Sequence, residues 1–209
     1  MTQIELKRTV FFDAHVASGA KMVDFGGWEM PIQYAGLSKE HLNTRSNVGL
    51  FDVSHMGEVW IEGADAHAAV KRWVTSSVDI VDGQAQYSLL CNEDGGIVDD
   101  IIVYRFSKEQ FLFCINASNR EKDVAWLEST VAADQDVRII NASDAYAQIA
   151  VQGRFAESTL QKMTDINLSE VKYYHFATGT VSAISNCIIA RTGYTGEDGF
   201  EVFFPMDAG

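Results

Sequence analysis

The stretch that decides the expected fold is Asn92-Glu93-Asp94-Gly95-Gly96-Ile97-Val98-Asp99-Asp100-Ile101-Ile102-Val103-Tyr104. Its Asn, Asp and Gly residues predict a tight turn, and the β-branched and aromatic residues that follow predict a strand. Because side chains alternate along a strand, Asp99 shares a face with Ile101 and Val103, whereas Asp100 lies on the other face. A buried carboxylate is costly unless a partner compensates it. We therefore expect that at least one of the two aspartates is placed in the strand for a functional or a structural reason. The structural alternative is that the aspartate caps a bulge or lies at a solvated edge.

The segments around this stretch predict an α+β fold with antiparallel sheets and flanking helices. Strands are expected at 84–91 and 97–106, joined as a hairpin, and at 111–115 beside them. Helices are expected at 64–74 and 120–131, where apolar residues recur at helical spacing.

Three local features give further expectations. The apolar alternation of 50–62 is interrupted at 54–57, which predicts a bulge or a bend. Ser38 is a candidate N-cap for a helix over 39–47. Residues 171–176 have the composition of a strand.

Composition and charge limit the class of protein. The chain has 209 residues, of which 47% are hydrophobic, and a net charge of −13. This length and apolar content suffice for a buried core. The excess of acids argues against a nucleic-acid partner, which needs a basic surface, and against an anionic membrane. No apolar run has the length of a membrane-spanning helix, so we expect no membrane partner.

Metal and nucleophile signatures are absent from the sequence. The three cysteines, Cys91, Cys114 and Cys187, form no C-x-x-C pair, and the five histidines show no H-E-x-x-H spacing. We expect no metal and a reducing compartment. No G-x-S-x-G motif occurs. The chemistry is therefore expected to depend on a bound small molecule.

A Gly-rich loop with a second acid lies near the end of the chain. Residues 191–201 read Arg-Thr-Gly-Tyr-Thr-Gly-Glu-Asp-Gly-Phe-Glu and match neither a P-loop nor a dinucleotide fingerprint. Glu201 stands between Phe200 and Val202, where a carboxylate can accept two parallel N–H bonds from a planar amidine-like group. Tyr194 can cover an aromatic face. The alternative is a decorated hairpin loop without a ligand.

Five runs, in order along the whole chain, together resemble the T-protein family of the glycine cleavage system. They are Met22-Val23-Asp24-Phe25-Gly26-Gly27-Trp28, Phe51-Asp52-Val53-Ser54-His55-Met56, Gly95-Gly96-Ile97-Val98-Asp99-Asp100-Ile101-Ile102-Val103-Tyr104, Asn116-Ala117-Ser118-Asn119-Arg120-Glu121-Lys122-Asp123 and Thr192-Gly193-Tyr194-Thr195-Gly196-Glu197-Asp198-Gly199-Phe200-Glu201.

The resemblance implies a tetrahydrofolate-dependent aminomethyltransferase. In that family an aminomethyl group arrives on the lipoyl arm of the H protein, ammonia leaves, and the carbon passes to N5 of tetrahydrofolate as methylene. The implied partners are folate and the lipoylated H protein, with tetrahydrofolate as acceptor and no metal. The implied compartment is the cytoplasm of a bacterium or the mitochondrial matrix of a eukaryote.

The resemblance also assigns roles to residues. It places Asp99 beside the reacting carbon as the catalytic residue, where a fixed negative charge stabilises an iminium-like cation and helps to position N5. It implies that Glu201 binds the edge of the pterin and that Ile115-Asn116 contacts the pterin partly through the backbone. The full implied folate-binding set is Met56, Tyr87, Asp99, Ile115, Asn116, Tyr174, Tyr194 and Glu201. Asp100 is expected to be structural.

The resemblance implies that 1–209 is a folate-binding region of two intertwined α+β subdomains. Members of the family continue with an arginine-bearing segment, whose arginine binds folate, and with a C-terminal barrel domain, and we expect neither in this sequence. Two other functions on the same scaffold stay open: another folate-linked enzyme such as a demethylase, and a non-enzymatic folate-binding protein. Proteins of the latter kind that assist iron–sulfur assembly carry K-G-C-Y-x-G-Q-E, where this chain has Arg191-Thr-Gly-Tyr-Thr-Gly-Glu.

Overall fold

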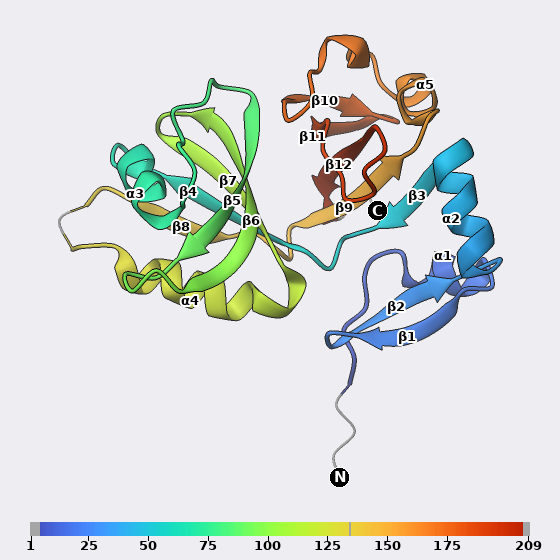
Figure 1. Cartoon of the computed structure of the whole chain (residues 1–209), viewed down its shortest axis with the longest axis horizontal. Helices are drawn as coiled ribbons and strands as arrows, with labels where there is room; N and C mark the ends of the chain where they lie inside the picture. Colours follow the sequence, from blue (N-terminus) through green and yellow to red (C-terminus); the bar gives the residue numbers. More distant parts are fainter. Residues whose placement is uncertain (1–4, 134, 207–209) are drawn as a thin grey trace. The chain divides into compact units, whose positions relative to one another are not determined.

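The computed structural model describes residues 5–133 and 135–206 (Figure 1). The chain divides into two compact units. Residues 56–145 and 174–176 form one, called here the inserted unit because its main segment interrupts the other. The remaining described residues form the flanking unit.

The inserted unit is a five-stranded antiparallel sheet with two helices. The strand order is β5-β6-β7-β4-β8, and the chain turns directly from β5 into β6 and from β6 into β7. The strands are β4 (Gly57–Glu62), β5 (Gln84–Cys91), β6 (Ile97–Ser107), β7 (Gln110–Ile115) and β8 (Arg138–Asn141). The helices are α3 (Ala66–Trp73) and α4 (Arg120–Thr130), and the 3₁₀ turn η1 (Ala117–Asn119) leads into α4.

The core of the inserted unit lies between one face of this sheet and the two helices. Val59 from β4 and Val103 from β6 are fully buried together with Val70 of α3 and Leu127 of α4. The alternation predicted for β6 is confirmed, because Asp99, Ile101 and Val103 are buried on this face while Asp100 is exposed.

The flanking unit contains a second five-stranded sheet with the order β10-β11-β12-β9-β3. Its strands are β3 (Gly49–Asp52), β9 (Tyr146–Gln152), β10 (Phe176–Val181), β11 (Ile184–Ala190) and β12 (Gly199–Pro205). A separate hairpin pairs β1 (Lys21–Phe25) with β2 (Trp28–Gln33). The helical elements are α1 (Phe12–Ala17), α2 (Leu37–Ser46), α5 (Ala156–Leu160), η2 (Gln161–Met163) and η3 (Leu168–Glu170). Phe200, Val202 and Phe204 of β12 are the centre of its core.

The α+β class with antiparallel sheets is confirmed, as are the hairpin and both predicted helices of the inserted unit. The interruption at 54–57 is a bend, but not a bulge within one strand: β3 and β4 belong to different sheets and different units. In the described part of the chain, no helix has the length and apolarity needed to span a membrane.

Two local predictions are wrong. Helix α2 starts at Leu37 after Gly36, whose φ of 116° favours glycine, so Ser38 lies inside the helix. Glu40 Oε1 accepts the backbone N–H of Gly36 in place of a serine cap (2.8 Å). The segment 171–176 is not a strand because Tyr174 has a left-handed φ of 55°, and β10 starts only at Phe176.

Candidate functional site

Asp99 of β6 is a buried carboxylate held by amide groups. Its residue is 5% exposed. Asp99 Oδ1 accepts hydrogen bonds from Asn116 Nδ2 (3.0 Å) and Asn119 Nδ2 (2.6 Å), and Oδ2 accepts the backbone N–H of Asn116 (3.1 Å). These bonds supply the compensation that the sequence pattern required for a carboxylate on an apolar face.

The chain places these donors because β7 ends at Ile115 and a helical segment follows immediately. Asn116 precedes η1 and Asn119 is its last residue, and α4 starts at Arg120. The start of a helix carries unpaired N–H groups and the positive end of its dipole, both of which stabilise an anion. Asp99 therefore lies where the turn from sheet to helix is most favourable to negative charge.

A second carboxyl, Asp123 in the first turn of α4, stands beside Asp99. Burial would raise the pKa of Asp99, but the neighbouring Asp123 carboxyl and the hydrogen bonds from Asn116 and Asn119 outweigh it and hold that pKa below its ordinary value. Burial, the hydrogen bond to Asp99 and the charge of Asp99 together raise the pKa of Asp123 to about 8. The pair therefore carries one negative charge at neutral pH, on Asp99.

Three other predicted site residues lie around this carboxylate. Tyr87 is half exposed, and its hydroxyl donates to Asp100 Oδ2 (3.2 Å), while Asn116 Nδ2 also contacts Asp100 Oδ1 (3.2 Å). Ile115 has no exposed surface. Its side chain belongs to the core, so Ile115 can meet a ligand only after a local rearrangement or through its backbone.

Met56 and Tyr174 are placed in the inserted unit by their neighbours. Met56 precedes Gly57, which pairs with Ile115 at the end of β7. The carbonyl of Tyr174 accepts the backbone N–H of Ala85 (2.8 Å), which fixes this left-handed residue beside the start of β5.

Glu201 and Tyr194 belong to the flanking unit. Glu201 Oε1 accepts Gln148 Nε2 (3.1 Å), and Oε2 accepts the hydroxyl of Thr192 (2.5 Å). Burial raises the pKa of Glu201 and outweighs the two hydrogen bonds, which lower it. Tyr194 is fully exposed and borders a cavity of about 520 Å³ together with Tyr34 and Phe51.

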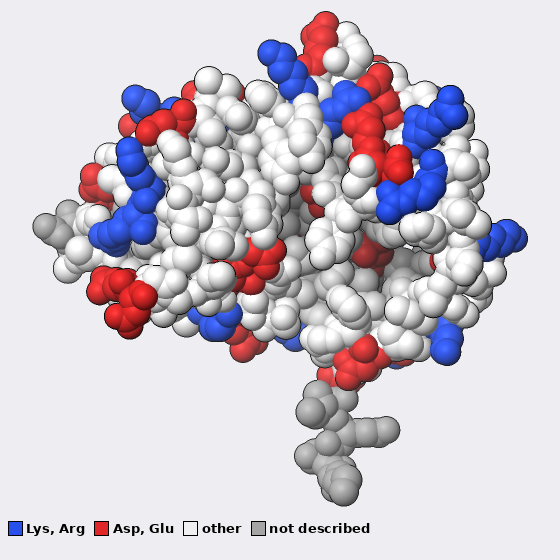
Figure 2. All heavy atoms as spheres, viewed as in Figure 1, with Lys and Arg blue, Asp and Glu red and all other residues white. Residues whose placement is uncertain are grey.

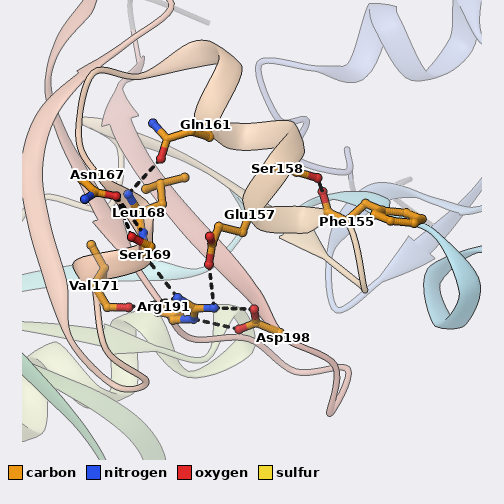
Figure 3. Close-up of polar contacts among 10 residues, drawn as sticks. All are labelled: Phe155, Glu157, Ser158, Gln161, Asn167, Leu168, Ser169, Val171, Arg191 and Asp198. Carbon is orange, nitrogen blue, oxygen red and sulfur yellow. Dashed lines mark hydrogen bonds and ion pairs between the residues drawn. The ribbon is translucent and has the colours of Figure 1, made fainter.

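Arg191 fixes the loop that carries Tyr194. Figure 3 shows it in contact with Glu157, Asp198 and the carbonyls of Leu168 and Val171. Its Nε and Nη2 donate to the two oxygens of Asp198, Nη2 also reaches Glu157, and Nη1 donates to both carbonyls. These contacts use all five N–H groups of a guanidinium. Arg191 is therefore a structural cation rather than a ligand-binding one.

The structure brings Asp99 and Asn116 into direct contact and joins Tyr87 to them through Asp100. The sequence interpretation missed Asn119, Asp123, Gln148 and Thr192, which hold the two carboxylates. A signal existed for Asp123 alone: it is an acid on the helix face that also carries Val124 and Leu127. Glu58 is a further buried acid, and burial raises its pKa well above the ordinary value.

Charge on one face of the molecule and metal-ligating side chains among the described residues were the remaining signs of a site. On the face that Figure 2 shows, basic side chains are interspersed with acidic ones and form no broad basic surface. Residues 5–133 and 135–206 contain no group of three or more His, Cys, Asp or Glu side chains that could hold a metal ion.

Comparisons with known proteins agree on one family. The family described as the GCVT N-terminal domain matches residues 11–209. An aminomethyltransferase of Desulfitobacterium hafniense (strain DSM 10664 / DCB-2) is 50% identical over 204 residues, which cover 97% of this chain and 55% of that protein. An aminomethyltransferase of Alkaliphilus oremlandii has the same identity and coverage. The chain thus spans about half the length of the curated relatives it matches.

Two solved structures are similar. The glycine cleavage system aminomethyltransferase T from Bartonella henselae has a TM-score of 0.88 at 34% identity, over 98% of this chain and 55% of that one. The heterotetrameric sarcosine oxidase from Corynebacterium sp. U-96 has a TM-score of 0.59 at 14% identity, over 81% of this chain and 83% of that chain, and shows the fold alone.

Proposed function

The chain belongs to the GCVT N-terminal domain family, and from this premise we propose that it forms the folate-binding part of a tetrahydrofolate-dependent aminomethyltransferase of the glycine cleavage system. Its substrates are then the aminomethyl-lipoyl H protein and tetrahydrofolate, and its products are ammonia and methylenetetrahydrofolate. The bacterial origin of the similar enzymes supports a cytoplasmic location.

The observation that carries the proposal is the buried anion of Asp99. When ammonia leaves an aminomethyl group, the remaining carbon becomes cationic. A carboxylate fixed in a dry site stabilises such a cation more than water does, because its donors need no rearrangement during the reaction. Asn116 and Asn119 keep Asp99 in place for this role.

The same hydrogen bonds argue against proton abstraction by Asp99. A carboxylate has about four lone-pair positions, and the amides of Asn116 and Asn119 occupy three of them. A general base also works best when its pKa lies near the operating pH, whereas the pKa of Asp99 is lowered. Asp99 therefore acts as a fixed charge beside the attacking N5.

Glu201 is proposed to bind the edge of the pterin. Each of its oxygens accepts one hydrogen bond from the protein, so each retains a lone pair for a ligand N–H. The amino group and ring N–H of a pterin form the planar pair of donors that a carboxylate accepts in parallel. Burial makes such a pairing stronger than it is at a surface.

The remaining positions are proposed as the lining of the folate site. Tyr87 and Tyr194 offer exposed aromatic surface for stacking. Met56 supplies an adaptable apolar contact. Asn116 offers its carbonyl to the ligand, and Ile115 offers its backbone. Tyr174 is proposed as a lining residue because of the family resemblance. Its left-handed backbone is an unfavourable conformation, which persists only where the surrounding structure requires it.

Calorimetric titration with 5-methyltetrahydrofolate tests this proposal. We expect saturable one-site binding to the chain, and a loss of at least about 30-fold in affinity for Glu201→Ala, the cost of leaving paired donors of the ligand unmet. Glu170→Ala is the matched control, because Glu170 is an exposed acid of the same unit. Absence of binding by the folded chain, or an equal loss in both variants, would refute the assignment of a pterin site to Glu201.

A further inference from the structure

Asp123 is the buried acid that the proposed reaction leaves without a role. It lies in the first turn of α4 with no exposed surface. Among the described residues, no N–H or O–H group forms a regular hydrogen bond to either of its oxygens. The Lys122 ammonium lies 3.5 Å from Oδ1 and also donates to the carbonyl of Val98. Apart from the Lys122 charge and the helix start, such a site offers no hydrogen bond to an ionised carboxylate.

A protonated carboxyl fits this site because it has an O–H group to donate. The acceptor is Asp99, whose carboxylate already receives three amide N–H groups and has one lone-pair position left. We propose that Asp123 is a positioning residue that retains its proton at neutral pH and donates it to Asp99 as the fourth hydrogen bond of that carboxylate. Only the effect of this hydrogen bond on folate binding rests on the proposed function.

The charged groups around Asp123 are consistent with this arrangement. Asp99 faces it from β6 and Lys122 from its own helix, while Asn116 and Asn119 are neutral. Asp100 lies on the opposite, exposed face of β6. Two carboxylates side by side in a dry site cannot both ionise cheaply, so one proton stays with the pair. The three amide donors decide which carboxyl is the anion, and the pKa of Asp123 is accordingly raised to about 8.

The consequence is a limit on the alkaline side. Above pH 8 Asp123 loses its proton, Asp99 loses a hydrogen bond, and the two negative charges repel each other. Asp99 then leaves the position fixed by the amides. Asp123→Asn keeps an N–H donor toward Asp99 and cannot ionise, so this variant should retain the arrangement at high pH. Asp123→Leu has the same number of side-chain heavy atoms and the same branching, but no donor.

The direct test is a carboxyl NMR titration of the protein labelled with ¹³C at Asp Cγ, from pH 4 to 10. We expect one aspartate to titrate near pH 8 in the wild type and this titration to vanish in Asp123→Asn. In Asp123→Leu the pKa of Asp99 should rise by about one unit. Asp94→Asn, which changes an exposed aspartate of the hairpin turn, should leave the signal unchanged. A wild type without an aspartate that titrates above pH 6 would overturn the proposal, and this result requires no variant to fold.

Binding of 5-methyltetrahydrofolate against pH gives the second readout. Wild-type affinity should fall about tenfold per pH unit above pH 8, whereas Asp123→Asn should stay level to pH 9. Level binding by the wild type up to pH 9 would refute the positioning role. A titration near pH 8 without folate binding at any pH would support the proton shared by the two aspartates and refute the proposed function, so the two failures are distinct.

Discussion

Replacement of Asp123 by Asn should change how the stability of the protein depends on pH. The pKa of Asp123 rises from an ordinary value of 3.8 to about 8 on folding. Between these values the folded state binds a proton that the unfolded state has released. Stability therefore falls as pH rises, by about 1.4 kcal/mol per pH unit, and the loss stops above the folded pKa.

The magnitude follows from this slope. At pH 7 the cost of keeping Asp123 protonated is about 4 kcal/mol relative to pH below 3.8. The lowered pKa of Asp99 acts in a separate window, because it adds stability above its unfolded pKa that is lost only as the solution is acidified below it. The raised pKa values of Glu58 and Glu201 also make the wild type less stable as pH rises. Only the difference between wild type and variant isolates Asp123.

Urea unfolding at pH 5, 6 and 7 measures that difference. We expect Asp123→Asn to gain about 3 kcal/mol relative to the wild type between pH 5 and pH 7. Glu128→Gln, a change at an exposed acid of the same helix, should run parallel to the wild type. Equal pH slopes for wild type and Asp123→Asn would show that Asp123 is ionised in the folded protein and that its pKa is not raised.

Four further changes test other parts of the structure by urea unfolding. Glu58→Leu should stabilise the protein by about 1–3 kcal/mol at pH 7, because both carboxylate oxygens are buried without a hydrogen bond among the described residues, and an unchanged midpoint would contradict this. His15→Ala should cost about 2–4 kcal/mol, since its ring joins the Tyr34 hydroxyl (2.7 Å) to a buried aspartate (2.9 Å), whereas Tyr34→Phe should cost only about 1 kcal/mol. Arg191→Lys should lower the free energy of unfolding by about 3 kcal/mol although the charge is kept, because lysine cannot form the several directed contacts to Asp198 and the carbonyls. A loss below about 1 kcal/mol would contradict this prediction.

Sequence periodicity predicted the parts of the fold that depend on local pattern. The hairpin of β5 and β6, the helices α3 and α4 and the burial of Asp99 all follow from alternation or helical spacing. The failures involve single backbone conformations. Tyr174 adopts a left-handed φ that its residue type does not suggest, and α2 starts after Gly36, whose backbone N–H binds Glu40 and not a serine.

The site was predicted in part for the same reason. The face of the strand on which Asp99 lies follows from the strand period. The donors that hold Asp99 come from the start of a helix, and only tertiary packing places that start beside the strand. Asn119 and Asp123 are local features of α4, and only the fold brings them beside β6. Likewise, Gln148 and Thr192 lie far apart in the sequence, and Gln148 meets Glu201 from the adjacent strand β9 whereas Thr192 meets it from the loop between β11 and β12.

The central claim is that Asp99 supplies a fixed charge for aminomethyl transfer. The most direct test is the single-turnover rate of methylenetetrahydrofolate formation from the aminomethyl-lipoyl H protein and tetrahydrofolate, measured for wild type, Asp99→Asn and Asp94→Asn. We predict that Asp99→Asn loses at least about 100-fold in rate while it still binds 5-methyltetrahydrofolate, and that Asp94→Asn matches the wild type. A wild-type rate in Asp99→Asn would contradict the account.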